Sequence, residues 1–485
     1  MTQMLPIARV LGLMAMVMSS THLLPIAASV IFEDGTLLPF LFSMVFNFTC
    51  GLLVWIATRH HRQDLRPRDG FMLVTLAWTG GAAFSTVPFL EAIPGLSFTD
   101  AYFESISALT TTGATVLVNL DTMPQAINLW RHLLQWLGGM GIIVLAVAVL
   151  PLLGIGGRQI FKAETPGPMK DTQLTPRITE TAKNLWLVYV GITFLCALAL
   201  RIAGMGWFDA VCHAFSTLST GGFSTHDASI GYFNSVAIEA VMIYFMMVAA
   251  VNFATHFLVF RGKSFLPYLR DVEARPVWAV LIASSLGIAA YLYDAGTYES
   301  FWTALRHASF NLVSVATSTG YASVDYANWP VFAPIWMLFL SCLACSSGST
   351  GGGIKMVRTL ILIQQAFREM RLLLHPSAVS VLKVGGAVIP NKIIFAVLAF
   401  IFVYFISLAA FTLILLASGL DLVTSISATL ASINNVGPGL GQVGPAGNYA
   451  LLTDFQKWLL AFAMLVGRLE LLTVFVLFTP GFWQK

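Results

Sequence analysis

The amino-acid sequence predicts an all-α polytopic membrane protein with ten spans. We expect four tandem units, each a span, a pore helix and a second span, around one central pore, with a two-helix extension at the N-terminus. Three observations predict this fold. Of the 485 residues, 57% are hydrophobic and only 10% are charged, a polar loop with a glycine recurs four times, and basic segments alternate with acidic ones. Soluble domains of this size carry more charge, and many apolar stretches reach the roughly 20 residues that cross a bilayer.

The first two spans are expected between residues 5 and 58, separated by a turn at Phe32–Gly35. The first apolar segment is long and lacks a convincing cleavage site, so we interpret it as a retained helix and not as a signal peptide. This pair carries no copy of the glycine loop. We therefore divide the chain into a helix pair at 1–69, repeat one at 70–157, repeat two at 158–262, repeat three with an intramembrane loop at 263–375, and repeat four at 376–485.

The glycine loop is the clearest sign of internal repetition. Its glycines recur at intervals of roughly 110 residues, a period that predicts tandem copies of one unit. Each copy places small hydroxyl or amide residues before the glycine. The copies are LTTTGAT with Gly113, LSTGGFS with Gly222, TSTGYAS with Gly320, and INNVGPGL with Gly437.

Each loop follows a short amphipathic piece that is too short to span. Ser107, Ser216 and Ser314 each lie six residues before their glycine. Such a piece fits a re-entrant pore helix, because irregular backbone at membrane depth must be buried in protein or line an aqueous cavity. The flanking spans are expected near 71–90 and 129–153, 184–204 and 235–260, 276–294 and 331–374 (interrupted), and 390–417 and 455–478.

Charge predicts the orientation. Most of the 26 Lys and Arg residues fall in four segments, at 59–68, 158–183, 261–275 and 358–392. The positive-inside rule assigns these segments, and with them both termini, to the cytoplasm. The alternate loops are acidic, so the pore helices enter from an acidic outer face. That face either raises the local concentration of cations, or it is acidic simply because the Lys and Arg residues stay on the cytoplasmic side.

Backbone carbonyls can replace the hydration shell of K⁺, because they are neutral, hard oxygen donors. Aiming them at one axis needs unusual backbone angles, which glycine adopts without steric cost. The alternative is a set of ordinary glycine turns in a packed bundle. The predicted ion ligands are the carbonyls of Thr111, Thr112, Gly113, Thr220, Gly221, Gly222, Ser318, Thr319, Gly320, Asn435, Val436 and Gly437.

These loops, the span–loop–span order and the extra N-terminal pair resemble the Trk/Ktr/HKT superfamily of cation transporters. NNVGPGLG at 434–441 and STGGFS at 219–224 are the most specific stretches. The resemblance covers nearly the full chain. It implies potassium uptake across the bacterial inner membrane, one pore per chain, a homodimer, and a cytosolic TrkA-like ring of nucleotide-binding regulatory subunits. Glycine at all four filter positions favours K⁺, whereas a serine accompanies Na⁺ preference in the plant branch. Only one glycine per loop is matched to the K⁺-channel filter, so Rb⁺ should be tolerated.

The stretch SSGSTGGGIK interrupts the second span of repeat three. Its serines and glycines would unwind a helix near mid-membrane depth, as a flexible gate or as a passive kink. A phosphate-binding loop is excluded, because Ile354 separates Gly353 from Lys355. The resemblance also implies an intramembrane gating loop. The predicted gate residues are Gly348, Ser349, Thr350, Gly351, Gly352, Gly353, Lys355 and Arg468.

Arg468 lies in the final apolar segment, where a charge is costly and faces a cavity or a partner. Glu470 lies two residues away and so points to another helix face. We expect Arg468 to face the pore and raise the barrier for cations, with pairing to an acid elsewhere as the alternative.

The predicted function is therefore K⁺ uptake through a gated, channel-like pore, with K⁺ as the transported ion and no organic cofactor. A symporter coupled to H⁺ or Na⁺ is the main alternative. An intramembrane enzyme is not favoured, because no nucleophile–base pair is visible at membrane depth. Cys342 and Cys345 have CxxC spacing but only small apolar neighbours, so we expect packing and not metal binding. The net charge of +3 indicates no nucleic-acid partner.

Overall fold

The computed structural model describes residues 4–61, 66–144 and 174–484, and this part of the chain is mostly helical. Within it, six helices are long and apolar enough to cross a membrane, or up to eight if each of two bent helix pairs counts as one span. The helical, membrane-spanning class predicted from composition is confirmed. The number of ten spans stays a prediction, because the helix after the first glycine loop runs up to undescribed residues.

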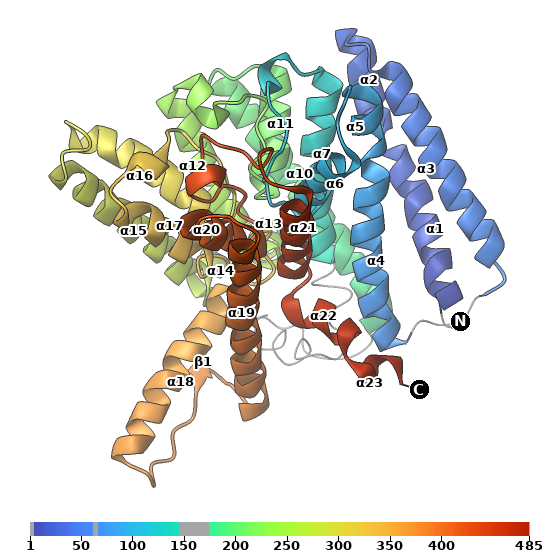
Figure 1. The fold of residues 1–485 in the computed structure, drawn as a ribbon. Helices are drawn as coiled ribbons and strands as arrows, with labels where there is room; N and C mark the ends of the chain where they lie inside the picture. Colours follow the sequence, from blue (N-terminus) through green and yellow to red (C-terminus); the bar gives the residue numbers. More distant parts are fainter. Residues whose placement is uncertain (1–3, 62–65, 145–173, 485) are drawn as a thin grey trace.

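The N-terminal helices stand at one edge of the molecule (Figure 1). They are α1 (Met4–Ser20), α2 (Leu23–Phe32) and α3 (Leu37–Thr58). α1 and α3 approach closely at two glycines, since a methyl group on Gly12 would lie 2.8 Å from the Gly51 carbonyl oxygen, and one on Gly51 would lie equally close to that of Gly12. Small residues allow such backbone approach in a membrane, where lipid offers no hydrophobic driving force.

The rest of the described chain forms four short central helices and the helices around them. Up to the second glycine loop they are α4 (Pro67–Ser85), α5 (Val87–Ala92), α6 (Phe98–Leu109), α7 (Gln125–Val144), α10 (Leu174–Ile202) and α11 (Trp207–Leu218). From there to the intramembrane loop they are α12 (Val236–Ala249), α13 (Phe253–Gly262), α14 (Leu266–Arg270), α15 (Ala274–Asp294), α16 (Phe301–Ala316) and α17 (Phe332–Ser341). The last part contains α18 (Met356–Leu374), α19 (Asn391–Ala417), α20 (Leu422–Ile433), α21 (Asp454–Arg468), α22 (Leu471–Phe475) and α23 (Pro480–Trp483).

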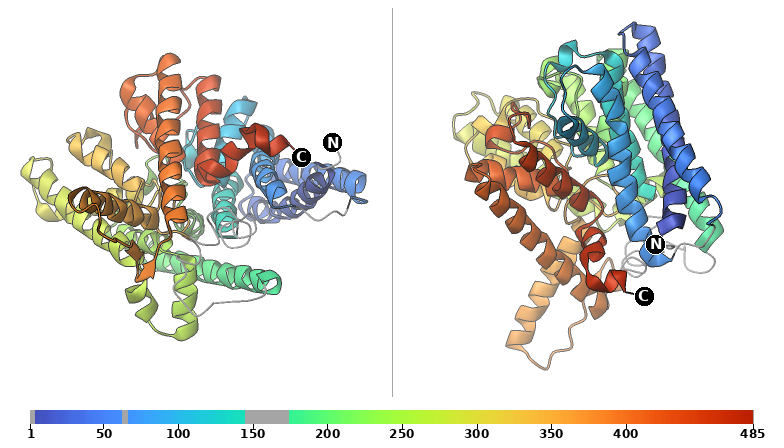
Figure 2. Two further views of the ribbon diagram at one scale, coloured as in Figure 1. Left: turned by 90° about the horizontal axis from the view of Figure 1, so that it is seen from below. Right: turned by 45° about the vertical axis from the view of Figure 1, so that its right-hand side comes forward.

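Single turns of 3-10 helix lie on the loops that follow the glycine loops and at the C-terminal end. They are η1 (Leu120–Thr122), η3 (Ser229–Phe233), η4 (Tyr326–Asn328), η5 (Gly441–Val443) and η6 (Val476–Phe478). A two-stranded hairpin of β1 (Lys383–Val384) and β2 (Ala387–Val388) pairs Lys383 with Val388. α18 and this hairpin extend beyond the helical body (Figure 1). The first and last described residues lie at that same end of the molecule (Figure 2).

The central helices α6, α11, α16 and α20 have 12 to 16 residues each. At 1.5 Å per residue they are about 18–24 Å long, which is less than the roughly 30 Å hydrocarbon core. Side chains cap three of their N-termini: Ser97, Ser300 and Asp421 accept hydrogen bonds from backbone N–H groups of the first turn. These helices are the predicted pore helices, and each is followed directly by a glycine loop.

Two of the expected spans are bent and not straight, which corrects the sequence-based expectation. The span at 235–260 divides into α12 and α13 with a 99° bend, and that at 455–478 into α21 and α22 with a 112° bend. At the first break the Asn252 side chain accepts a hydrogen bond from Ala254 N at 2.8 Å and so starts a new helix. At the second, Glu470 has a φ of 63°, which ends the α-helix.

A buried ion pair connects the first pore helix to the second unit. Arg131 on α7 donates to Glu104 on α6 at 2.8 Å, and both side chains are fully buried. Arg131 also donates to the Ser224 carbonyl oxygen at 3.2 Å. Glu104 accepts hydrogen bonds from Thr115 Oγ1 and from Val116 N, each at 3.0 Å. The two charges therefore hold the segments that directly follow the first two glycine loops.

Replacing Arg131 by Met should lower the free energy of unfolding by about 3–5 kcal/mol, because Glu104 is then left buried and unpaired. The double change Arg131→Met and Glu104→Gln should cost less than the single one. Thermal unfolding of the detergent-solubilised chain would measure both. A double variant as unstable as the sum of the two single variants would contradict this coupling.

Candidate functional site

All four pore helices end in the same backbone geometry. The second residue before each glycine has a left-handed φ: 52° at Thr111, 52° at Thr220, 56° at Ser318 and 53° at Asn435. Around each of these residues the N–H groups bond back to the last helical turn, for example Thr111 N to Ala108 O at 2.9 Å and Thr112 N to Ser107 O at 2.8 Å. This is a Schellman ending, which normally uses glycine at the left-handed position.

The other three loops have matching hydrogen bonds at the same positions. A threonine, serine or asparagine at a left-handed position is uncommon and is energetically unfavourable. The same left-handed turn therefore recurs at the C-terminus of all four pore helices. Its effect is to turn the chain sharply at the pore-helix C-terminus, so that the next two residues run toward the centre of the molecule.

The four glycines meet in a ring. A methyl group placed on any of them would lie between 1.9 and 2.6 Å from a carbonyl oxygen of the next loop. The contacts run from Gly113 to Gly221, from Gly222 to Thr319, from Gly320 to Val436, and from Gly437 back to Thr112. Each glycine also has a φ between 76° and 91°. A side chain is therefore excluded at these positions both by the backbone angle and by the neighbouring loop.

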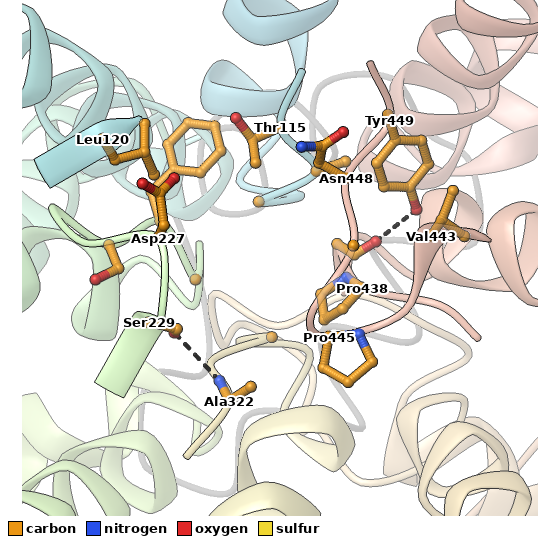
Figure 3. A pocket seen from close by; sticks show the side chains of 18 of the residues that line it. Thr115, Leu120, Asp227, Ser229, Ala322, Pro438, Val443, Pro445, Asn448 and Tyr449 are labelled. Carbon is orange, nitrogen blue, oxygen red and sulfur yellow. Dashed lines mark hydrogen bonds between the residues drawn. The ribbon is translucent and has the colours of Figure 1, made fainter. Parts of the chain in front are cut away.

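A cavity opens on one side of this ring, and all four glycines line it. We call it the outer cavity, after the orientation predicted from the charge pattern. Figure 3 shows the cavity with segments of all four units around it. Asp227, Ser229, Ala322, Pro438 and Tyr449 contribute to its wall. The predicted loops thus lie together around one space.

Most of the loop residues are buried, Gly113, Gly222 and Gly320 are partly exposed to the cavity, and the loop carbonyls are largely without donors. Of the twelve carbonyls predicted as ligands, only those of Gly221 and Gly437 accept a hydrogen bond from a described residue. Buried carbonyls in folded proteins are nearly always paired with a donor or with water. The remaining oxygens are therefore available to a cation or to water.

Two side chains that sequence reasoning missed contact the loops. Gln135 Nε2 on α7 donates to the Gly221 carbonyl at 2.6 Å, and the Gln135 Oε1 atom accepts from Ser216 Oγ at 2.5 Å. Tyr449 Oη donates to the Gly437 carbonyl at 2.6 Å. Gln135 lies 86 residues from Gly221 in the chain, and no local pattern indicates this contact.

The predicted intramembrane loop lies against the C-terminal ends of the pore helices. Thr350 Oγ1 donates to the Leu218 carbonyl at 3.1 Å, and Gly352 N donates to Ser318 Oγ at 2.8 Å. A methyl group on Gly352 would lie 2.0 Å from the Asn434 carbonyl oxygen. The loop therefore contacts the ends of three pore helices.

Arg468 ends α21 and points at this loop. Its Nη1 donates to the Thr350 carbonyl at 2.6 Å, and the side chain is buried. No described residue bonds to its Nε or Nη2. Lys355 Nζ donates to the Gly351 carbonyl. Glu470 pairs with Arg358 at 2.8 Å instead of with Arg468. Within the described chain, Arg468 forms no ion pair with an acid.

His226 bridges two acids at the edge of the cavity. Its Nδ1 lies 2.5 Å from Asp121 Oδ1, and its Nε2 lies 3.7 Å from Asp209 Oδ2. Burial lowers the pKa of His226, but the two carboxylates more than offset this effect, so its pKa is raised. The same imidazole lowers the pKa of Asp121, against the opposing effect of burial.

These features define a helical membrane protein in which four glycine loops of one chain enclose a single site lined by peptide oxygens. The chain belongs to the TrkH family, described as cation transport proteins, whose family model matches residues 39–291 and 296–485. The resemblance to the Trk/Ktr/HKT superfamily is thereby confirmed.

Similar proteins match over nearly the full length. The Trk system potassium uptake protein TrkH of Vibrio parahaemolyticus is 45% identical over 482 residues, 99% of each chain. That of Escherichia coli K12 is 42% identical over 480 residues with the same coverage. The crystal structure of the potassium transporter TrkH from Vibrio parahaemolyticus matches with a TM-score of 0.92 at 43% identity, covering 99% of this chain and all of that one.

The His226 bridge predicts a pH dependence of stability. A group whose pKa is raised by folding contributes stability that is complete below its ordinary pKa of 6.5 and is lost as pH rises through the raised value. The midpoint of thermal unfolding should therefore fall as pH rises from mildly acidic to alkaline. His226→Gln should flatten this part of the profile, and an unchanged profile would contradict the assignment.

Proposed function

We propose that this chain takes up K⁺ through the ring of glycine loops, with Rb⁺ tolerated. The observation that carries the proposal is the set of loop carbonyls around one cavity that accept no hydrogen bond from a described residue. An ion that leaves water needs replacement oxygens, and neutral carbonyls provide them for K⁺ without binding it too tightly. The relatives are named as potassium uptake proteins, which supports the choice of ion.

The helix dipoles support a cation at this point. The C-termini of the four pore helices all lead into the ring, and a helix C-terminus carries a partial negative charge. The loop carbonyls that accept no hydrogen bond from a described residue add to that negative potential. Both features favour a positive ion in the centre of the molecule and disfavour an anion.

The gate, in this proposal, is the intramembrane loop together with Arg468. Thr350 and Gly352 contact the inner ends of pore helices. The Arg468 guanidinium bonds to the Thr350 carbonyl and keeps two nitrogens without a described partner. A positive charge beside the ion path repels a passing cation. We therefore assign both to control of ion flow on the inner side of a channel-like pore.

The wider organisation is part of the same proposal. We propose the five-part division at 1–69, 70–157, 158–262, 263–375 and 376–485, with both termini in the cytoplasm of a bacterial inner membrane. A homodimer that binds a cytosolic ring of nucleotide-binding subunits completes it. The naming of the relatives as members of a Trk system supports association with further components.

Gly222→Ala tests the ring. The added methyl group would lie 2.0 Å from the Thr319 carbonyl oxygen, so we expect at least a roughly tenfold loss of K⁺-competed ⁸⁶Rb⁺ uptake into proteoliposomes. Gly191→Ala on α10 is the matched control, because nothing lies within 4 Å of its added methyl group. Full uptake by the Gly222→Ala protein would refute the proposed filter.

Arg468→Ala tests the gate. Removing the charge should raise Rb⁺ flux by roughly tenfold, which corresponds to about 1.4 kcal/mol off the barrier. Arg468→Lys keeps the charge and should stay close to the unmodified protein. Equal flux for all three proteins would show that Arg468 does not limit ion passage.

A further inference from the structure

The Tyr449 hydroxyl group contacts one filter carbonyl directly. It donates a hydrogen bond of 2.6 Å to the carbonyl oxygen of Gly437. The Tyr449 side chain is 2% exposed and lines the outer cavity. Figure 3 shows the Tyr449 ring beside Asn448 and Val443, with the bond running to the loop next to Pro438.

This contact has no counterpart in the other three units. The carbonyls of Gly113, Gly222 and Gly320 occupy the equivalent position, and none accepts a hydrogen bond from a described residue. The ring of glycine carbonyls therefore consists of three oxygens that accept no hydrogen bond from a described residue and one, that of Gly437, that accepts a hydrogen bond. The fourfold sequence repeat thus produces a ring whose fourth member is chemically different.

A donated hydrogen bond changes a carbonyl as an ion ligand. The hydroxyl proton carries positive charge and occupies one of the two lone pairs of the oxygen. It also restrains the direction in which the oxygen points. Selection among alkali ions depends on the number of coordinating carbonyls and on their field strength. A ring with fewer coordinating oxygens favours the smaller Na⁺, because the larger K⁺ needs more oxygens to replace its hydration shell.

We propose that Tyr449 is a specificity-determining residue that withholds the Gly437 oxygen from the outer ion ring. This inference rests on the proposed function, because it assumes that ions pass the four glycines. The inference adds that one hydroxyl group sets how strongly the pore prefers K⁺ over Na⁺. The proposed function alone does not say which residue sets this preference.

A purely structural role of the Tyr449 hydroxyl group can be tested separately from its role in ion selection. Tyr449 N donates to the Thr115 carbonyl at 2.9 Å, and this backbone bond joins the fourth unit to the first. The Tyr449 ring also packs against Phe103, with centroids 5.4 Å apart. Both contacts persist in phenylalanine. Tyr449→Phe therefore removes the donor and leaves the link between the units in place.

The test is competitive ⁸⁶Rb⁺ uptake into proteoliposomes by the full-length protein, with K⁺ and with Na⁺ as competitors. In Tyr449→Phe the freed Gly437 oxygen joins the ring. We expect the half-inhibiting K⁺ concentration to fall, and the ratio of half-inhibiting Na⁺ to K⁺ concentrations to rise, each by roughly fivefold, the effect of one neutral hydrogen bond.

Tyr326→Phe is the matched control. Tyr326 is also buried, but its hydroxyl group has no hydrogen-bond partner among the described residues. Its removal should leave both values unchanged. A second variant with monofluorotyrosine at position 449 has a stronger donor of nearly the same size, so both values should shift in the opposite direction from Tyr449→Phe. This variant decides the matter if Tyr449→Phe fails to fold.

Values for Tyr449→Phe and for the fluorinated protein that equal those of the unmodified protein would overturn the inference while leaving the proposed function intact. Equal shifts in Tyr449→Phe and Tyr326→Phe would also overturn it, since the effect would then be general. If the unmodified protein itself took up no Rb⁺ that K⁺ competes for, the proposed function would fail instead.

Discussion

The structure depends on one kind of contact, in which a peptide oxygen of one loop approaches the Cα atom of a glycine in the neighbouring loop. It occurs four times, and the last instance returns to the first loop. An oxygen can sit this close only where no side chain intervenes. The same absence of a side chain allows the positive φ that brings the oxygen to the centre. Close approach and backbone angle are therefore a single requirement, which the four glycines meet together.

The ring is only approximately fourfold. A methyl group added to Gly113, Gly222 or Gly320 would lie between 1.9 and 2.1 Å from the neighbouring carbonyl oxygen, whereas one added to Gly437 would lie 2.6 Å from that of Thr112. This wider contact joins the two ends of the repeated region, and side chains brace it: Asn435 Nδ2 donates to Thr112 Oγ1 at 2.9 Å. Beside the contact between the first two units, Gln135 donates to the Gly221 carbonyl and Arg131 donates to the Ser224 carbonyl. Because the units are covalently linked, each can diverge separately, and the polar contacts around the oxygens then differ from unit to unit.

The sequence predicted the features that depend on local pattern. The four glycine loops, the short helices before them and the break at Gly348–Gly353 follow from spacing, length and residue type, and the structure contains all three. Gln135 and Tyr449 could not be predicted, because each acts on an oxygen that only folding brings near. The bends at Asn252 and Glu470 were missed for a different reason. A straight span and a broken span have the same hydropathy, and no sequence pattern indicates that a glutamate adopts a left-handed backbone conformation.

The break between α21 and α22 has a consequence beside the intramembrane loop. A helix C-terminus presents carbonyls without helical partners, and these carbonyls attract positive charge. Arg468 lies at such an end, and its guanidinium bonds to the Thr350 carbonyl, in the loop that lies against three pore-helix C-termini. The negative potential that would draw K⁺ to this region also stabilises the arginine there. In the proposed function, Arg468 thus acts as a tethered cation in the negative region that the transported ion would enter. A movement of α22 or α18, which Glu470 and Arg358 join, would change the position of that charge.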